Sequence, residues 1–413
     1  MPVPPAHDHP ACRCRGRCCG ACACAAAAGS DGRQARRRRL LSATAGTLLA
    51  ALAARSPAAA LAPGPASAAR GAAPPTGAGV GHRAFPLQRG AGGLAARRLL
   101  FWYPSTEGGS RTEPAGHGSR IWRDAPAAPG RHPVVLFSHG FLGAADQSLF
   151  ITANLARMGY VVAAIDHGDA IDRGARMELP DVLRPGNWTD ATQSERRNDL
   201  VGLLDRLEGL DGDADAFLHR RLDLGRIGAI GHSLGGYAVL GLAGARTAWR
   251  DARIHAVAGL SPYTAPYLMP GGFGSIEIPV MLQGGSFDFG ITPLLPRFHA
   301  LLRAPRYLLV LRGGNHLGWT DHAIAGQDAR AAIRDGNPRW IFEYLLAFLD
   351  HHLRGLDRTP VLRTPNPALE SFESDPGRVQ RTGQPAREAS PRSRADSDPM
   401  NAANASGVLA TGR

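Results

Sequence analysis

Residues 226–236 constrain the fold of this chain more than any other segment. They read Arg-Ile-Gly-Ala-Ile-Gly-His-Ser-Leu-Gly-Gly: a short apolar run, then the pattern Gly-x-Ser-x-Gly, then a helix-forming stretch. This order is typical of a tight strand-to-helix turn that exposes a serine nucleophile. Glycines at 231 and 235 remove the collisions that side chains would make in such a turn. The pattern is common in a chain with 51 glycines, but its position between an apolar run and a helical stretch predicts that Ser233 is a nucleophile.

The amino-terminal segment has the features of an export signal. Four arginines at 36–39 precede an apolar run at 40–54, and small-x-small cleavage motifs follow at 58–60 and 66–68. The arginines resemble a twin-arginine signal. A membrane anchor is disfavoured because the run is mostly alanine and shorter than the roughly 20 apolar residues of a spanning helix. We therefore expect residues 1–68 to be an extension and export signal, and the mature protein to be periplasmic or extracellular without a stable membrane span.

All six cysteines lie upstream of this signal, between Cys12 and Cys24. With His7 and His9 nearby, they can be interpreted as a soft-metal site. A low-complexity extension before a signal favours another interpretation, namely a translation start assigned too early. The mature protein then contains no cysteine, which excludes both disulfides and a cysteine nucleophile.

Composition also defines the outer parts of the chain. Residues 1–69 hold nine arginines and two acidic residues, so much of the net charge of +12 lies outside the core. Without a concentrated basic stripe, no nucleic-acid partner is expected. Residues 69–93 are rich in Ala, Gly and Pro and are predicted to be a flexible linker. Residues 373–413 lack aromatic side chains and are predicted to be disordered.

The core, residues 94–372, alternates strand-length apolar runs with helical patterns. Strands are expected at 99–103, 134–138, 161–165, 227–230, 256–260, 280–283 and 307–311, and helices at 148–158, 195–207 and 340–353. This alternation predicts an α/β domain with a mostly parallel sheet and helices on both faces. Residues 263–279 are too few for a large cap domain.

A serine nucleophile needs a base and an orienting acid, and in a parallel sheet such residues follow the carboxyl ends of strands. His316 follows the strand at 307–311 through a glycine turn, and Asp288 follows the strand at 280–283. The order Ser233, Asp288, His316 is the order of α/β-hydrolases. We therefore predict these three residues as the catalytic triad.

Other candidates fit this rule less well. Asp166 precedes the nucleophile and is expected to shape the pocket or fix a loop, and Asp321 lies just past His316. His255 begins a strand, at the wrong edge. The other rejected histidines lie in predicted helices or loops: His299, His322, His351 and His352.

The oxyanion hole needs two backbone N–H groups. One is expected from Leu234, directly after the nucleophile. The other is expected from Phe141, in the loop His139-Gly140-Phe141 that follows the strand at 134–138.

Together these segments resemble the α/β-hydrolase superfamily, and more closely its platelet-activating factor acetylhydrolase-like and dienelactone hydrolase-like serine esterases. The resemblance rests on residues 101–105, 134–140, 159–167, 230–237 and 314–316. It implies a carboxylic ester hydrolase. Two departures limit it: dienelactone hydrolases use cysteine, and in the acetylhydrolases the acid follows the earlier strand, where this chain has Ser261-Pro262-Tyr263. The later acid is shared with cutinase-like polyester hydrolases.

The substrate is expected to be a small-molecule, lipid or polymer ester bound in an open cleft. Trp188, Tyr263 and Trp319 are candidate pocket residues, and the segment 168–194 is a candidate apolar wall. The alternatives are a cutinase-like polyester hydrolase, a lipase, or a non-catalytic binding protein of the same fold. Neither a metal-ligand cluster nor a phosphate-cradling loop is found in the core, so no metal or cofactor is expected. The sequence leaves the oligomeric state open.

Overall fold

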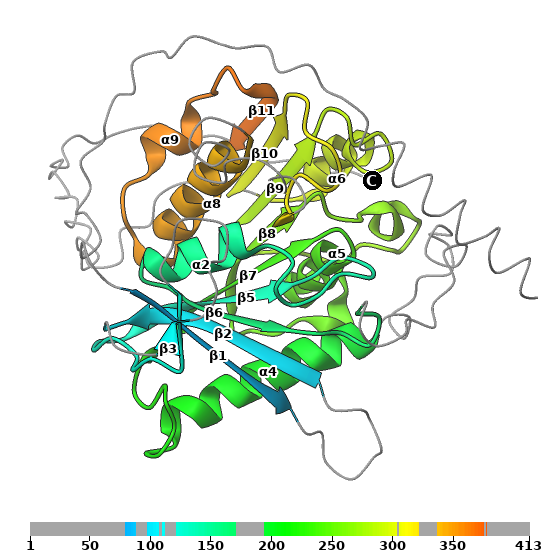
Figure 1. Cartoon of the computed structure of the whole chain (residues 1–413). Helices are drawn as coiled ribbons and strands as arrows, with labels where there is room; N and C mark the ends of the chain where they lie inside the picture. The colour runs from blue at the N-terminus through cyan, green and yellow to red at the C-terminus, as the bar shows by residue number, and fades with distance from the viewer. Residues whose placement is uncertain are drawn as a thin grey trace, which may run out of the picture.

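The computed structural model describes residues 79–87, 97–106, 110–111, 121–170, 194–303, 305–321, 337–375 and 377. These residues contain one sheet with the strand order β11-β10-β9-β8-β7-β5-β6-β2-β1-β4-β3 (Figure 1). The strands are β1 (Gly79–Leu87), β2 (Arg97–Ser105), β3 (Ser110–Arg111), β4 (Ile121–Arg123), β5 (His132–Ser138), β6 (Val161–Ile165), β7 (Leu222–His232), β8 (Ile254–Leu260), β9 (Val280–Gly285), β10 (Arg306–Leu311) and β11 (Leu369–Asp375).

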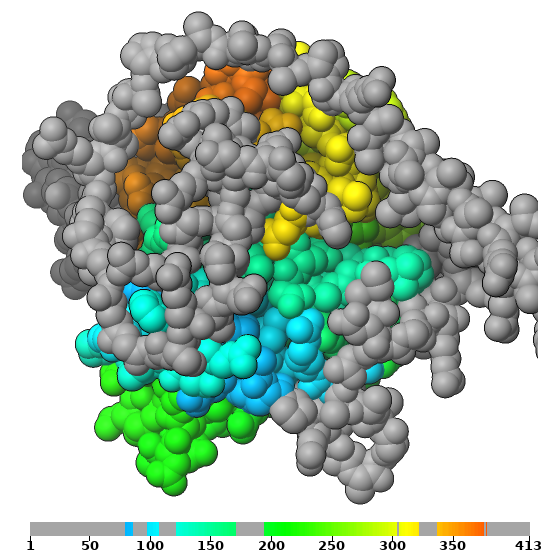
Figure 2. Space-filling model, in the orientation of Figure 1, coloured from blue at the N-terminus to red at the C-terminus, as the bar shows by residue number. Residues whose placement is uncertain are grey.

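The centre of the sheet is parallel, as the alternation of apolar runs predicts. Strands β6, β5, β7, β8, β9 and β10 pair in parallel, while β2 and β11 join antiparallel at either side. Strand β6 is buried along its whole length. Burial on both faces explains why the central strands are apolar runs without alternation. In the space-filling view, the first strands (blue and cyan) lie below the teal segment and the last elements (orange) lie above it (Figure 2).

Helices cover both faces, and each face has its own hydrophobic core. The helices are α2 (Leu149–Arg157), α4 (Ser194–Gly212), α5 (Leu234–Leu240), α6 (Leu295–Leu301), α8 (Asn337–Arg354) and α9 (Thr359–Arg363). Helices α4, α5 and α6 contribute to one core, and α2, α8 and α9 to the other. One face of α8 is buried, including Ile341, Leu345 and Phe348.

The predicted flexible linker at 69–93 is wrong over residues 79–87. These residues form β1, which pairs antiparallel with β2 and parallel with β4. Gly81 lies so close to the Tyr103 ring that a Cβ there would overlap it. Phe85 stacks on Phe101 at a ring-centroid distance of 5.2 Å. Small residues allow this close pairing, and the same small residues give the segment the composition of a linker.

The predicted boundary at 372 is also too early. Strand β11 continues to Asp375, and its residues Phe372, Ser374 and Asp375 pair with β10. Because β11 is an edge strand, charged side chains point to solvent there, and the strand has the polar composition of a tail.

Residues 261–279, between β8 and β9, contain one short 3₁₀ turn, Ala265–Leu268, and no cap domain. Among the described helices, none combines the length and the apolarity that crossing a membrane requires.

Candidate active site

Ser233 lies at the turn between β7 and α5 in a strained backbone conformation. Its φ is 54° and its ψ is −116°, a region that costs a non-glycine residue on the order of 1–3 kcal/mol. The Ser233 N–H donates to the carbonyl of Leu260 at 3.0 Å, and the Ser233 carbonyl accepts from Tyr237 and Tyr263 at 3.1 and 2.9 Å. These bonds hold the serine in the strained turn.

The glycines around Ser233 are required by close approach. A Cβ on Gly231 would overlap the Gly235 carbonyl, and one on Gly235 would overlap the Ser138 carbonyl at the end of β5. A Cβ on Gly236 would collide with Pro262 after β8. The helix therefore starts against the ends of the neighbouring strands, as the sequence predicts.

The structure brings Ser233, His316 and Asp288 together in one hydrogen-bonded chain. His316 Nε2 lies 3.0 Å from Ser233 Oγ, and His316 Nδ1 lies 2.8 Å from Asp288 Oδ2. The Asp288 side chain is 4% exposed and that of His316 is 29% exposed. A buried carboxylate fixes the imidazole while the imidazole edge stays accessible, which is the arrangement that serine activation needs.

Ser261, which sequence reasoning did not select, also lies in this cluster. It follows β8 with a φ of 45°. Its Oγ donates to Asp288 Oδ2 and lies 3.1 Å from His316 Nδ1. The sequence does contain a signal for Ser261: it directly follows β8. This strand lies between the strand that precedes the nucleophile and the strand that precedes the acid.

His232 packs under His316, with ring centroids 4.9 Å apart. Its Nε2 lies 2.8 Å from the carbonyl oxygen of His316, an acceptor, so Nε2 carries the proton and Nδ1 accepts from the Gln147 amide at 3.1 Å. Burial, with the neighbouring His316, lowers the pKa of His232 to about 3. His232 is therefore uncharged, and its ring packs against the ring of His316, the proposed base.

Both predicted oxyanion donors lie next to the nucleophile. Leu234 is the first residue of α5, and the first N–H groups of a helix have no partner within it. Phe141 follows Gly140, and a Cβ on Gly140 would lie 3.4 Å from Ser233 Cβ. The Gly140 N–H donates to Gln147 Oε1 at 3.2 Å, so Gln147 connects this loop to His232.

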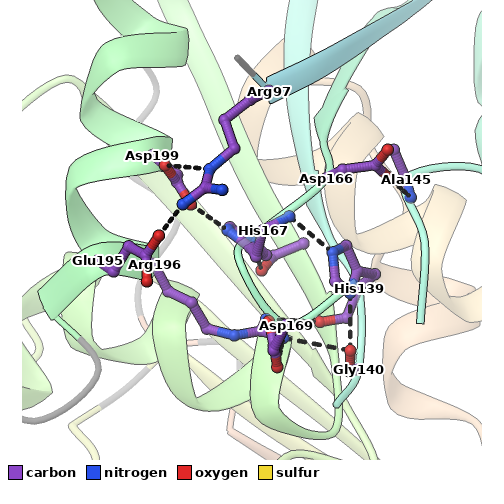
Figure 3. A network of polar contacts seen from close by, with 11 residues as sticks. Arg97, His139, Gly140, Ala145, Asp166, His167, Asp169, Glu195, Arg196 and Asp199 are labelled. Atoms are coloured by element: carbon purple, nitrogen blue, oxygen red, sulfur yellow. Dashed lines mark hydrogen bonds and ion pairs between the residues drawn. The ribbon is translucent and has the colours of Figure 1, made fainter. Parts of the chain in front are cut away.

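A buried polar network lies behind the same loop (Figure 3). His167 Nε2 lies 2.9 Å from Ser138 Oγ, and His167 Nδ1 lies 3.0 Å from Asp199 Oδ2. Arg97 donates to Asp199 at 3.4 Å and pairs with Glu195. On the other side of the network, Arg196 reaches the loop from α4 (Figure 3).

The two rejected acids have structural roles, and for Asp166 the role is one of those expected. Asp166 accepts from the Ala145 N–H at 2.8 Å and from Arg98 at 2.7 Å, which fixes the loop after β5. Burial alone would raise the pKa of Asp166, but these hydrogen bonds outweigh it and the pKa is lowered. Asp321 accepts from the N–H groups of Leu149 and Phe150 and caps α2. His255 lies at the amino end of β8, away from the site.

Of the predicted pocket residues, Trp319 is corrected to a core residue. Its side chain is 0% exposed, and its indole N–H donates to Gln283 at 3.0 Å. It packs near His232 because a large apolar ring is more stable when it is buried. Tyr263 is 9% exposed beside the nucleophile turn. Trp188 and most of the predicted wall at 168–194 lie outside the described residues.

Two comparisons with known proteins give matches. The family model for platelet-activating factor acetylhydrolase, isoform II, matches residues 103–176. Among solved structures, a ferulic acid esterase from Streptomyces cinnamoneus matches with a TM-score of 0.53 and 22% identity, over 72% of this chain and 96% of that one. No curated protein sequence matches. The structural match confirms the α/β-hydrolase fold. The family model supports the resemblance to acetylhydrolase-like esterases.

The described residues contain no group of three or more His, Cys, Asp or Glu side chains arranged to hold a metal ion.

Proposed function

We propose that the protein is a serine carboxylic-ester hydrolase that forms an acyl-enzyme on Ser233. The observation that carries the proposal is the chain from Ser233 Oγ to His316 Nε2, at 3.0 Å, and from His316 Nδ1 to Asp288, at 2.8 Å. The strained turn supports it independently, because backbone strain of this kind concentrates at functional sites.

The proposed reaction assigns one group of this chain to each step. His316 Nε2 takes the proton of Ser233 Oγ as that oxygen bonds to the ester carbonyl carbon. The N–H groups of Leu234 and Phe141 stabilise the resulting oxyanion. His316 then gives its proton to the leaving alkoxide, which departs as the alcohol. Water next attacks the acyl-enzyme and loses a proton to His316; this proton passes to Ser233 Oγ as the carboxylic acid is released.

Covalent labelling tests the nucleophile directly. A fluorophosphonate probe is expected to label the wild-type protein but not Ser233→Ala. Equal labelling of both proteins would refute Ser233 as the nucleophile. Absence of labelling in a folded wild-type protein would favour a non-catalytic protein of this fold.

The ester class is tested with a substrate panel. The names of the matched proteins suggest two members, an acetylated phospholipid and a feruloyl ester. The panel also includes nitrophenyl esters of increasing acyl length and a polyester film. These substrates test the lipase and the cutinase-like alternatives. An open cleft predicts activity beyond acetate, so activity restricted to acetate would refute a long-chain or polymer substrate.

We also propose export by the twin-arginine route, on the basis of the arginines at 36–39 and the apolar run after them. Residues 1–68 fused to a folded reporter are expected to direct its export. Replacing the four arginines with lysines is expected to stop export, and unchanged export would refute this route.

A further inference from the structure

The carbonyl group of Gly140 is held by three donors. Arg196 Nη2 donates to it at 3.2 Å, His139 Nδ1 at 2.7 Å and the Gly143 N–H at 3.1 Å. The same peptide unit ends in the N–H of Phe141, the proposed oxyanion donor. In a trans peptide the carbonyl oxygen and the N–H point in opposite directions. Fixing the carbonyl inward therefore aims the Phe141 N–H away from the network, and Gly140 itself abuts Ser233.

Arg196 binds this loop at two points. Its Nη1 also donates to the His139 carbonyl at 2.7 Å, so one guanidinium binds two consecutive carbonyls. Asp169 accepts from Nη2 at 2.7 and 2.8 Å and fixes the guanidinium in place. The Arg196 residue is 2% exposed, and such a planar group has little freedom once it is paired.

His139 supports the same carbonyl through its tautomer. Its Nε2 accepts from the His167 N–H at 2.9 Å, so the ring proton resides on Nδ1 and is donated to Gly140. Burial, with Arg196 and His167 nearby, holds the pKa of His139 well below its usual value, so the ring stays neutral. Figure 3 shows Arg196, Asp169 and His139 converging on Gly140.

We propose that Arg196 is a positioning residue for catalysis: it holds and polarises the Gly140–Phe141 peptide so that the Phe141 N–H is aimed at the developing oxyanion. Withdrawal of electron density from the carbonyl by a cation makes the N–H of the same amide a stronger donor. The effect is therefore larger in the transition state than in substrate binding. This inference rests on the proposed function, because it needs an oxyanion to form beside Ser233.

The test compares Arg196→Gln with a matched variant, Arg354→Gln. Arg354 also donates to one carboxylate, Asp350, and one backbone carbonyl, Met158, but lies on α8 away from the site. With a short nitrophenyl ester, Arg196→Gln is expected to lower kcat about ten- to hundredfold, less than removal of a whole oxyanion donor, with KM little changed. Arg354→Gln is expected to keep kcat near the wild-type value.

A second readout separates positioning from general loss of structure. An alkyl trifluoromethyl ketone forms a tetrahedral oxyanion adduct with the serine, so its affinity is expected to fall in parallel with kcat/KM. A guanidinium salt added to Arg196→Ala is expected to restore part of kcat. If Arg196→Gln does not fold, the variant Arg196→Met/Asp169→Asn removes both buried charges and is expected to show the same fall in kcat.

Unchanged kcat in a folded Arg196 variant, an equal fall in Arg354→Gln, or unchanged ketone affinity would each overturn the inference. Failure of the proposed function is distinguishable, because the wild-type protein would then lack ester hydrolysis, or Ser233→Ala would retain it, whatever the Arg196 variants do.

Discussion

The described residues contain two hydrogen-bonded Ser–His–Asp chains of nearly the same dimensions. In one, Ser233, His316 and Asp288 are joined at 3.0 and 2.8 Å. In the other, Ser138, His167 and Asp199 are joined at 2.9 and 3.0 Å. Both bond a histidine through Nε2 to a serine and through Nδ1 to an aspartate. The distances therefore do not distinguish a reactive chain from an inert one.

The backbone and the exposure of the two serines differ. Ser138 is the last residue of β5 and 0% exposed, so no substrate can approach its Oγ. Ser233 directly follows the last residue of β7 and directly precedes α5, and its backbone is in the left-handed region. A reactive serine therefore requires access and nearby N–H donors as well as a base. We infer that the buried chain stabilises the loop that carries those donors.

Replacing each of the two serines is expected to give the largest difference between the reactive and the buried chain. Ser233→Ala is expected to lower kcat by about 10⁴- to 10⁶-fold, because the nucleophile is lost. Ser138→Ala is expected to keep the rate within a few fold and to lower stability by about 1–3 kcal/mol, because His167 Nε2 loses its partner. Ester hydrolysis and urea unfolding measure the two effects. A large loss of the ester hydrolysis rate in a stable Ser138→Ala variant would contradict the assignment of catalysis to Ser233 and stability to Ser138.

Replacing the two aspartates tests the same difference between the reactive chain and the buried chain, now at the acid of each. Asp288→Asn is expected to lower kcat by roughly 10⁴-fold, since an amide favours the wrong tautomer of His316. Asp199→Asn removes a buried charge that pairs with Arg97 and His167, and its effect is expected mainly in the denaturation midpoint. If Asp288→Asn keeps its rate, Asp288 is not the acid.

Ser261→Ala tests the acid end of the reactive chain, where Ser261 Oγ donates to Asp288. Loss of the hydrogen bond to Asp288 is expected to lower kcat by about three- to tenfold, the effect of about 1 kcal/mol. The pH–rate profile is expected to move as well, because the bond stabilises the carboxylate that orients His316. A profile identical to that of the wild type would limit Ser261 to a structural role.

A further expected effect concerns stability in acid. His232 has a folded pKa of about 3, below its ordinary value of 6.5. The unfolded chain therefore binds the proton more readily, and stability is lost as the pH falls from about 6.5 towards 3. His232→Gln is expected to show a shallower decline of Tm over this interval. A decline as steep as that of the wild type would assign the acid sensitivity to other groups.

Sequence reasoning worked best where one local rule decides the outcome. The glycines at 231 and 235, the strands at the centre of the sheet, and the placement of Asp288 and His316 after strands all follow from local pattern. Ser261, Arg196 and Gln147 were missed because their roles depend on partners that are distant in sequence. Trp319 was misassigned because proximity to His316 in sequence does not reveal which way a side chain points. β1 was missed because its small residues have the composition of a linker.

The pairing of β1 with β2 determines how much of the amino terminus can be removed. Both cleavage motifs, at 58–60 and 66–68, precede Gly79, so processing at either one leaves the sheet whole. A chain shortened to residue 94 would lose β1 and expose the backbone N–H and C=O groups of β2 along an apolar edge. Such an edge recruits other chains. Recombinant production from residue 94 is therefore expected to give aggregates, whereas production from residue 69 gives soluble protein.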